Sequence, residues 1–380
     1  MNNLRPVSYP QKLSYQLLMI LLIGVFIYLG HGVLVPIYFS ILLSILLLPV
    51  TNFLGRFLPA TLANFIAVIL ALAIIAGTIY FLTSQMAGFF NDIQSIREHL
   101  AEHLTTLQTW AEQTLHISSA QQKIFIENAK EGIRHSGGQY IGQTFLTLSG
   151  TAFLIVMVTI YSFLILCYRH LIKRFLFAVF NSEHEESLKY VLLESKQIIQ
   201  KYMTGLLIEM AIVATCNSIV LLLIGVKYAI FLGVFAAVLN IVPYVGLFTG
   251  LLFTVIVTLG NSSDMHNIIW ILVSMEIIHF LDANFLMTKI VGSKVKINAL
   301  MTIVGVVIGG SLIGLPGVFL ALPTIAILNV IFSQVDELKP WSILLSHDRE
   351  KVHPKRILKN LQKLADKQKK TFLKKSSAKI

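Results

Sequence analysis

Four ionisable side chains occur within long apolar stretches of the sequence. Glu276, His279 and Asp282 follow one another at intervals of three residues, and Glu209 lies in an earlier stretch. At 100° per residue, the first three fall within an arc of about 120° on one helix. Carboxylates and an imidazole on one side of a helix can relay protons or hold a cation. We therefore predict that these four residues couple the protein to an ion.

Three of these residues also have a simpler explanation. Glu209 could lie near a helix end, where it could reach the interface or pair with Lys201. His279 could make one hydrogen bond in a contact between helices, and Asp282 could pair with Lys289. Because charges inside a membrane usually face a cavity, the surroundings of these side chains distinguish the two explanations.

The elements that carry these residues must be membrane helices. The chain of 380 residues is 56% hydrophobic and only 13% charged, with a mean hydropathy of +0.76. Uncharged runs cover residues 13–55, 57–91, 135–168 and 297–335, and each is at least as long as the roughly 17–25 residues of a membrane-spanning helix. Backbone groups in lipid must bond to one another, so we predict an all-α integral membrane protein with about eight transmembrane helices.

The distribution of charge divides the chain into six regions. They are a three-helix membrane segment with a turn at residues 30–32 (1–84), a polar, amphipathic extracytoplasmic region (85–143), a fourth transmembrane helix (144–168), a cytoplasmic amphipathic helix (169–204), a core transport segment (205–335) and a basic cytoplasmic tail (336–380). Basic residues lie on the cytoplasmic side of membrane proteins, which predicts cytoplasmic termini. The loop with Lys289, Lys294 and Lys296 would face outward in a simple count of eight crossings. Either this loop folds back or one long segment is re-entrant.

Two apolar segments, residues 228–259 and 300–332, are longer than one straight crossing and contain Pro and Gly near their middle. The breaks contain Asn240, Pro243 and Gly246 in the first segment, and Gly310, Gly314, Pro316 and Gly317 in the second. Interrupted helices in corresponding positions indicate a substrate path, because unwound backbone within a membrane must line protein or water. The alternative is a pair of proline kinks with glycines that permit close helix packing.

The sequence lacks the common signatures of catalysis. It has no phosphate-binding G-x-x-x-x-G-K-[ST] motif, no H-E-x-x-H and no G-x-S-x-G. We therefore predict neither an enzyme nor a bound cofactor or metal. The formal net charge of +11 is concentrated in the tail; beside a membrane, such a tail contacts anionic lipid headgroups rather than nucleic acid.

Three stretches together resemble the autoinducer-2 exporter (AI-2E) family of eight-helix bacterial membrane proteins. They are residues 202–229 around helix five, residues 239–246 at the first break, and residues 282–323, which include Asp282, Asn284 and the second break. Asp282 stands where the family usually has Glu, which keeps the carboxylate. Lys227, Leu206, Leu247 and Thr288 replace the usual Pro, Gln, Pro and Pro.

The resemblance implies a multi-pass protein of the bacterial cell (inner) membrane that exports a small solute. The solute would be a quorum signal in some members, whereas cation/proton antiport is proposed for others, and a homo-oligomer is expected. Two other functions stay open: a membrane scaffold or regulator without transport, and a passive channel lined by the broken helices.

Overall fold

The computed structural model describes residues 9–92, 150–180, 184–240, 245–261, 265–286 and 297–346, and this part of the chain is helical with no strand beyond one isolated bridge. Six of its helices are long and apolar enough to cross a membrane: Leu17–Leu54, Ala60–Phe89, Gly150–Val179, Glu185–Ile224, His266–Leu286 and Leu315–Gln334. Large apolar side chains are exposed along them, such as Leu29 and Tyr80, as a lipid-facing surface requires. The predicted all-α membrane class is confirmed. The region 85–143 lies largely outside the described residues, as do Pro243, the loop with Lys289 and most of the tail.

The first helix, α1 (Tyr9–Leu54), is continuous over 46 residues, although the sequence predicted a turn at residues 30–32. A glycine inside a helix costs only about 1 kcal/mol relative to alanine, and apolar residues flank Gly30 and Gly32 on both sides. The His31 ring donates a hydrogen bond to the Tyr28 carbonyl at 2.7 Å, within the same helix. The two predicted helices are therefore one element.

Buried serines join α1 to the helix Gly150–Val179. Ser40 Oγ donates to the Val158 carbonyl at 3.1 Å, and Ser44 Oγ donates to the Ser162 carbonyl at 3.2 Å. Ser162 Oγ in turn donates to the Ser40 carbonyl at 3.4 Å. Small side chains with hydroxyl groups allow two helices to approach closely and to bond within an apolar medium.

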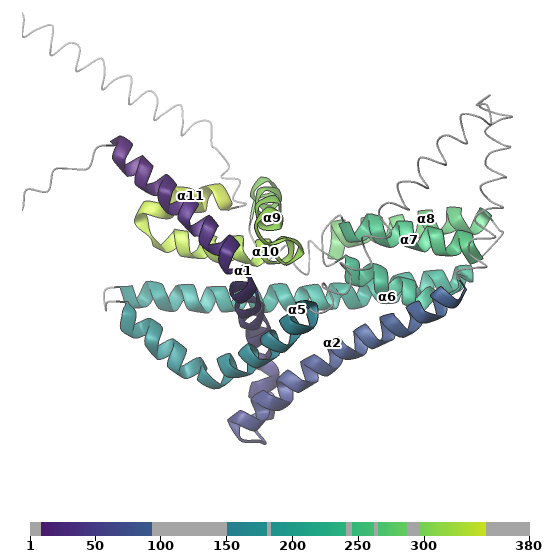
Figure 1. Ribbon diagram of the computed structural model, residues 1–380, viewed down its shortest axis with the longest axis horizontal. Coiled ribbons are helices and arrows are strands. Elements are labelled where there is room, and N and C mark those ends of the chain that lie inside the picture. Colours follow the sequence, from purple (N-terminus) through teal and green to yellow (C-terminus); the bar gives the residue numbers. More distant parts are fainter. Residues whose placement is uncertain are drawn as a thin grey trace, which may run out of the picture.

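The long helix α5 (Glu185–Ile224) is the central element of the structure (Figure 1). It runs without interruption through residue 204, where the sequence placed a boundary between a cytoplasmic and a membrane helix. It packs against α1, α6 (Ala229–Leu239), α8 (Met265–Leu281) and α10 (Leu315–Gln334). Side chains on α5 therefore meet those of several other helices.

Two helical hairpins flank α5. In the first, α6 turns back into α7 (Val245–Asn261), and a Cβ at Gly246 would lie 2.0 Å from the Leu239 carbonyl oxygen. In the second, α9 (Ala299–Ile313) turns back into α10 at Gly314, whose φ is +68°. A Cβ at Gly317 would lie 1.9 Å from the Gly309 carbonyl oxygen. The glycines thus permit direct backbone contact between the two helices of each hairpin.

Backbone contacts hold the two ends of the carboxyl-terminal region together. Ile297, before α9, pairs with Ser346, after α11 (Lys339–Leu345). The Asn298 amide donates to the Leu345 carbonyl at 3.1 Å, and its side chain donates to the Leu344 carbonyl at 2.6 Å. A short 3-10 helix, η3 (Asp336–Leu338), precedes α11. The chain therefore enters α9 and leaves α11 on the same side of the molecule.

The remaining helix, α2 (Ala60–Asn91), contacts α1 and reaches α6 (Figure 1). Its Phe89 joins a buried apolar cluster with Leu221 of α5, Phe231 of α6 and Met275 of α8. Phenylalanine rings pack against one another in this cluster; the Phe235 and Phe253 ring centroids are 5.0 Å apart. This packing fixes the positions of α5, α6 and α8 relative to one another.

Candidate functional site

Glu209 lies on the buried side of α5. Its side chain is only 5% exposed, and Tyr202, Val213 and Leu221 lie on the same buried side. The alternative of a pair with Lys201 is not found: Lys201 is eight residues from Glu209, about 12 Å along α5, and its ammonium donates to Gln197. An acid in this position is held within the protein rather than at the membrane surface.

His279 and Asp282 lie on the buried side of α8, where they are 8% and 6% exposed. The α-helix ends at Leu281, and residues 282–286 form one π-helical turn. Such a turn widens the helix and re-aims the side chains within it, and π-turns are frequent at functional sites. The local backbone thus places Asp282 against α5 and α6.

Asp282 connects three helices. The Asn240 side-chain amide, at the end of α6, donates to Asp282 Oδ2 at 3.1 Å. The Glu209 carboxyl group of α5 interacts with the Asp282 carboxyl group, and the His279 ring lies near the same group. We call Glu209, Asn240, His279 and Asp282 the carboxyl cluster.

Several polar atoms of the carboxyl cluster have no partner among the described residues. They are Glu209 Oε2, Asp282 Oδ1 and His279 Nε2, all buried. Two carboxyl groups side by side in an apolar medium are stable when they share a proton or a cation, because two bare negative charges repel strongly there. The two carboxyl groups are therefore placed so that they can share a proton.

Glu276 lies apart from this cluster. It is exposed on α8 and lines an open groove with Leu272, Val273, Ile277, Phe280 and Leu281. Its charge still acts on His279, one turn away. The three residues predicted to share one arc are therefore separated. His279 and Asp282 lie in the contact between α5 and α8, and Glu276 lies outside it.

The other predicted path residues are dispersed. Asn284 donates from its side chain to the Phe280 carbonyl at 2.8 Å within its own helix. Gly310, Gly314, Pro316 and Gly317 belong to the α9–α10 hairpin. That hairpin packs through Ile313 and Leu320 on a cluster with Ile199, ten residues before Glu209 on α5 and thus about 15 Å away along the helix.

Two tyrosines, the buried Tyr202 and the half-buried Tyr38, were not predicted as site residues from the sequence. Tyr202 is 3% exposed on α5 and interacts electrostatically with Glu209 and Tyr38. The Tyr38 hydroxyl lies 2.8 Å from Thr324 Oγ1 and so connects α1 to α10. The interval of seven residues between Tyr202 and Glu209, two helical turns, is a signal that could have identified Tyr202.

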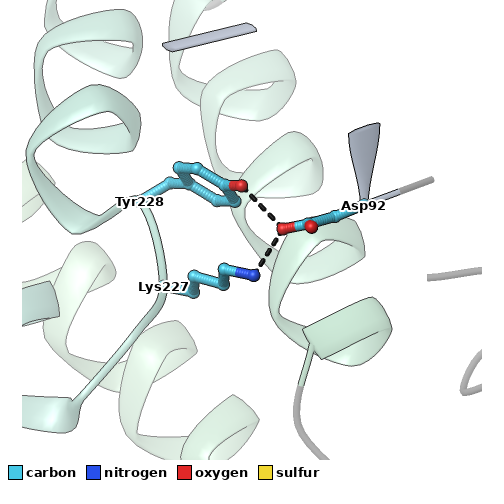
Figure 2. A network of polar contacts seen from close by, with 3 residues as sticks. All are labelled: Asp92, Lys227 and Tyr228. Atoms are coloured by element: carbon cyan, nitrogen blue, oxygen red, sulfur yellow. Dashed lines mark hydrogen bonds and ion pairs between the residues drawn. The ribbon is translucent and has the colours of Figure 1, made fainter. Parts of the chain in front are cut away.

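A second polar group lies at the other end of α6, and we call Asp92, Lys227 and Tyr228 the surface cluster (Figure 2). Asp92, directly after α2, accepts a hydrogen bond from the Lys227 ammonium and one from the Tyr228 hydroxyl at 2.6 Å. Tyr228 has a φ of 64°, a strained conformation for a side chain of this size. The cluster ties the end of α2 to the turn between α5 and α6.

The surface cluster is fully paired. The hydrogen bond from Lys227 holds the pKa of Asp92 below its usual value, and the bond from Tyr228 acts in the same direction. The hydrogen bond to Asp92 raises the pKa of Tyr228 to about 12. This arrangement is typical of a structural ion pair.

Comparisons with known proteins agree with the description of a membrane protein. The model of a family described as AI-2E family transporter matches residues 17–337. The chain is similar to a Bacillus subtilis (strain 168) protein named "Putative transport protein YueF", with 25% identity over 79% of this chain and 83% of the relative. It is also similar to a protein of the same description from that organism, YrrI, with 24% identity over 78% of this chain and 84% of the relative.

Proposed function

The chain belongs to the AI-2E transporter family, and on this basis we propose that it moves a small solute or a monovalent cation across the bacterial cell (inner) membrane, driven by a proton or sodium gradient. The observation that carries the proposal is the carboxyl cluster, in which Asp282 meets Glu209 and Asn240 deep among apolar helices. Buried ionisable groups that converge from several membrane helices are typical of coupling sites.

In this mechanism, the carboxyl cluster binds the coupling ion, and binding changes the hydrogen bond that Asn240, at the end of α6, donates to Asp282. A proton or cation between Glu209 and Asp282 removes their mutual repulsion. Asn240 then donates its hydrogen bond to a neutralised group, so the strength of the α6–α8 contact depends on occupancy of the site. A change in this contact would shift the α6–α7 hairpin and alternate access to the site.

We further propose that both hairpins are re-entrant. The 11 residues of α6 span about 16 Å, which is half of the roughly 30 Å of hydrocarbon. A hairpin of α6 and α7 would return the chain to the outer side, and α8 would then cross inward. The loop with Lys289 would become cytoplasmic, together with the basic tail, as the shared side of Ile297 and Ser346 supports. With α1 as one element, this topology has five full crossings (α1, α2, Gly150–Val179, α5 and α8). It places the amino terminus on the outer side, in place of the predicted eight crossings with both termini cytoplasmic.

The test is flux in proteoliposomes that contain the purified full-length chain. Sodium-22 uptake and export of a panel of small hydroxylated solutes are measured under imposed proton and sodium gradients. Accumulation against a concentration gradient supports a secondary transporter. Flux only down a gradient indicates a passive channel, and absence of flux for the whole panel indicates a scaffold or regulator. Cross-linking in native membranes tests the expected homo-oligomer.

A further inference from the structure

One buried side chain on α5 is neither charged nor paired. Asn217 is 0% exposed, and both its amide nitrogen and its amide oxygen lack a hydrogen-bond partner among the described residues. An Asn side chain offers two donor hydrogens and an acceptor oxygen, and burial without partners is costly for all of them. The position therefore requires a reason other than packing.

Two other buried polar side chains, both on α7, are satisfied by their own helix. Thr254 Oγ1 donates to the Gly250 carbonyl at 2.8 Å, and Thr258 Oγ1 donates to the Thr254 carbonyl at 2.8 Å. Both threonines are on α7 and are as deeply buried as Asn217. A structural role of the threonine kind therefore does not account for Asn217.

Asn217 lies on the same side of α5 as the carboxyl cluster. Glu209, Val213, Asn217 and Leu221 are spaced four residues apart, and all four are buried. Asn217 is eight residues beyond Glu209, or about 12 Å along the helix. Asn217 is thus the next polar residue after Glu209 in this series, with Val213 between them.

The register between α5 and α8 places Asn217 between two landmarks. Glu209 meets Asp282 at one level, and Leu221 shares an apolar cluster with Ile271 and Met275 at another. The helices are therefore antiparallel, and Asn217 lies between the carboxyl cluster and this apolar cluster. An ion or solute that moves between α5 and α8 would pass this point before it meets the aromatic packing.

We infer that Asn217 is a second binding position on the transport path, where its amide holds a hydroxyl oxygen of water or of a hydroxylated solute. The amide can donate to such an oxygen and accept from its hydrogen at the same time. Asn does not titrate near neutral pH, so this position binds and orients a polar group but relays no proton itself. The inference rests on the proposed transport function and extends it by one residue.

Cysteine accessibility tests the path. Asn217→Cys and the control Thr254→Cys are made in a background in which Cys167 and Cys216 are replaced by Ala. The variants are treated in proteoliposomes with 2-aminoethyl methanethiosulfonate, a small water-soluble reagent. We expect modification at position 217 and none at position 254 until the protein is denatured. Equal lack of reaction at both positions would overturn the inference.

Competition with a solute distinguishes whether the oxygen bound at position 217 belongs to water or to a hydroxylated solute. Slower modification of Asn217→Cys in the presence of ribose or glycerol would assign the position to a solute hydroxyl group. An unchanged rate would assign it to water. Modification in either case shows that the position is accessible from water.

Flux provides a second measurement that does not require a cysteine. Asn217→Leu should lower flux about tenfold, since a tenfold change corresponds to one lost hydrogen bond of ordinary strength, and Asn217→Ser should recover part of it. Flux of Asn217→Leu equal to that of Thr254→Val would contradict the inference. If Asp282→Asn leaves flux intact, the proposed function fails instead, and the labelling of position 217 still stands on its own result.

Discussion

The two polar clusters at opposite ends of α6 differ in how their aspartates are partnered. In the surface cluster, Asp92 accepts hydrogen bonds from a cation and a hydroxyl group, and its side chain is 29% exposed. In the carboxyl cluster, Asp282 is buried, accepts a bond from a neutral amide and lies beside a second acid. A paired aspartate near water stabilises the fold modestly, whereas an incompletely paired one in an apolar interior must be neutralised. We propose that the surface cluster stabilises the fold and that the carboxyl cluster takes part in transport.

The largest expected effect is on transport. Asp282→Asn should reduce gradient-driven flux by about 10-fold to 100-fold, because a lost interaction between the coupling ion and a charged group costs about 1.5–3 kcal/mol and 1.4 kcal/mol corresponds to tenfold. Asp92→Asn, the matched control, should stay within about twofold of the wild type. Both are measured as sodium-22 uptake in proteoliposomes. Equal loss in the two variants would remove the distinction between the clusters.

For thermal stability we expect the larger loss in Asp92→Asn and the smaller in Asp282→Asn, the reverse of the order for flux. Asp92→Asn removes the charge that Lys227 and Tyr228 share, so the melting temperature in detergent should fall by a few degrees, and less at high salt, where ion pairs are screened. Asp282→Asn keeps an acceptor for Asn240 and removes a buried charge, so its melting temperature should equal or exceed that of the wild type. A larger loss for Asp282→Asn would assign it a structural role.

A smaller effect is expected within α8. Glu276→Gln should change flux by less than about threefold, because the exposed Glu276 lies outside the carboxyl cluster and acts on His279 only at a distance. The measurement is the same uptake assay. A loss as large as that of Asp282→Asn would restore the predicted set of three residues on one helix.

The smallest expected effect comes from the shifted pKa values of Tyr228 and Asp92 in the surface cluster. The folded pKa of Tyr228 is raised to about 12, so its contribution to stability is complete below about pH 10, the pKa of the unfolded chain, and is lost as pH rises through 12. The lowered pKa of Asp92 acts in the other direction: its contribution is complete above the unfolded value near pH 4 and is lost only at lower pH. The ultraviolet difference between the wild type and Tyr228→Phe should show one tyrosine that ionises near pH 12. Ionisation near pH 10 would mean that Asp92 is not its partner.

Charge spacing predicted much of this molecule but not its polar interior. The uncharged runs located α2 and α10, because lipid excludes charge. The turn at residues 30–32 was wrong, since glycines within a long apolar stretch do not by themselves end a helix. The spacing of three residues located His279 and Asp282, but periodicity alone does not show where the contact with α5 ends, and Glu276 lies beyond that edge. Asn217 carries no charge, so a prediction based on ionisable residues does not identify it.

The contact between Gly309 and Gly317 limits how the protein can move. The two backbones touch at this point with no side chain between them. The helices therefore have no deformable side chains here that would allow them to slide past each other. We expect α9 and α10 to travel as one rigid body through any transport cycle. The deformable layer must then be the larger side chains, such as Leu320, Leu42 and Ile199, where this body rests on α1 and α5.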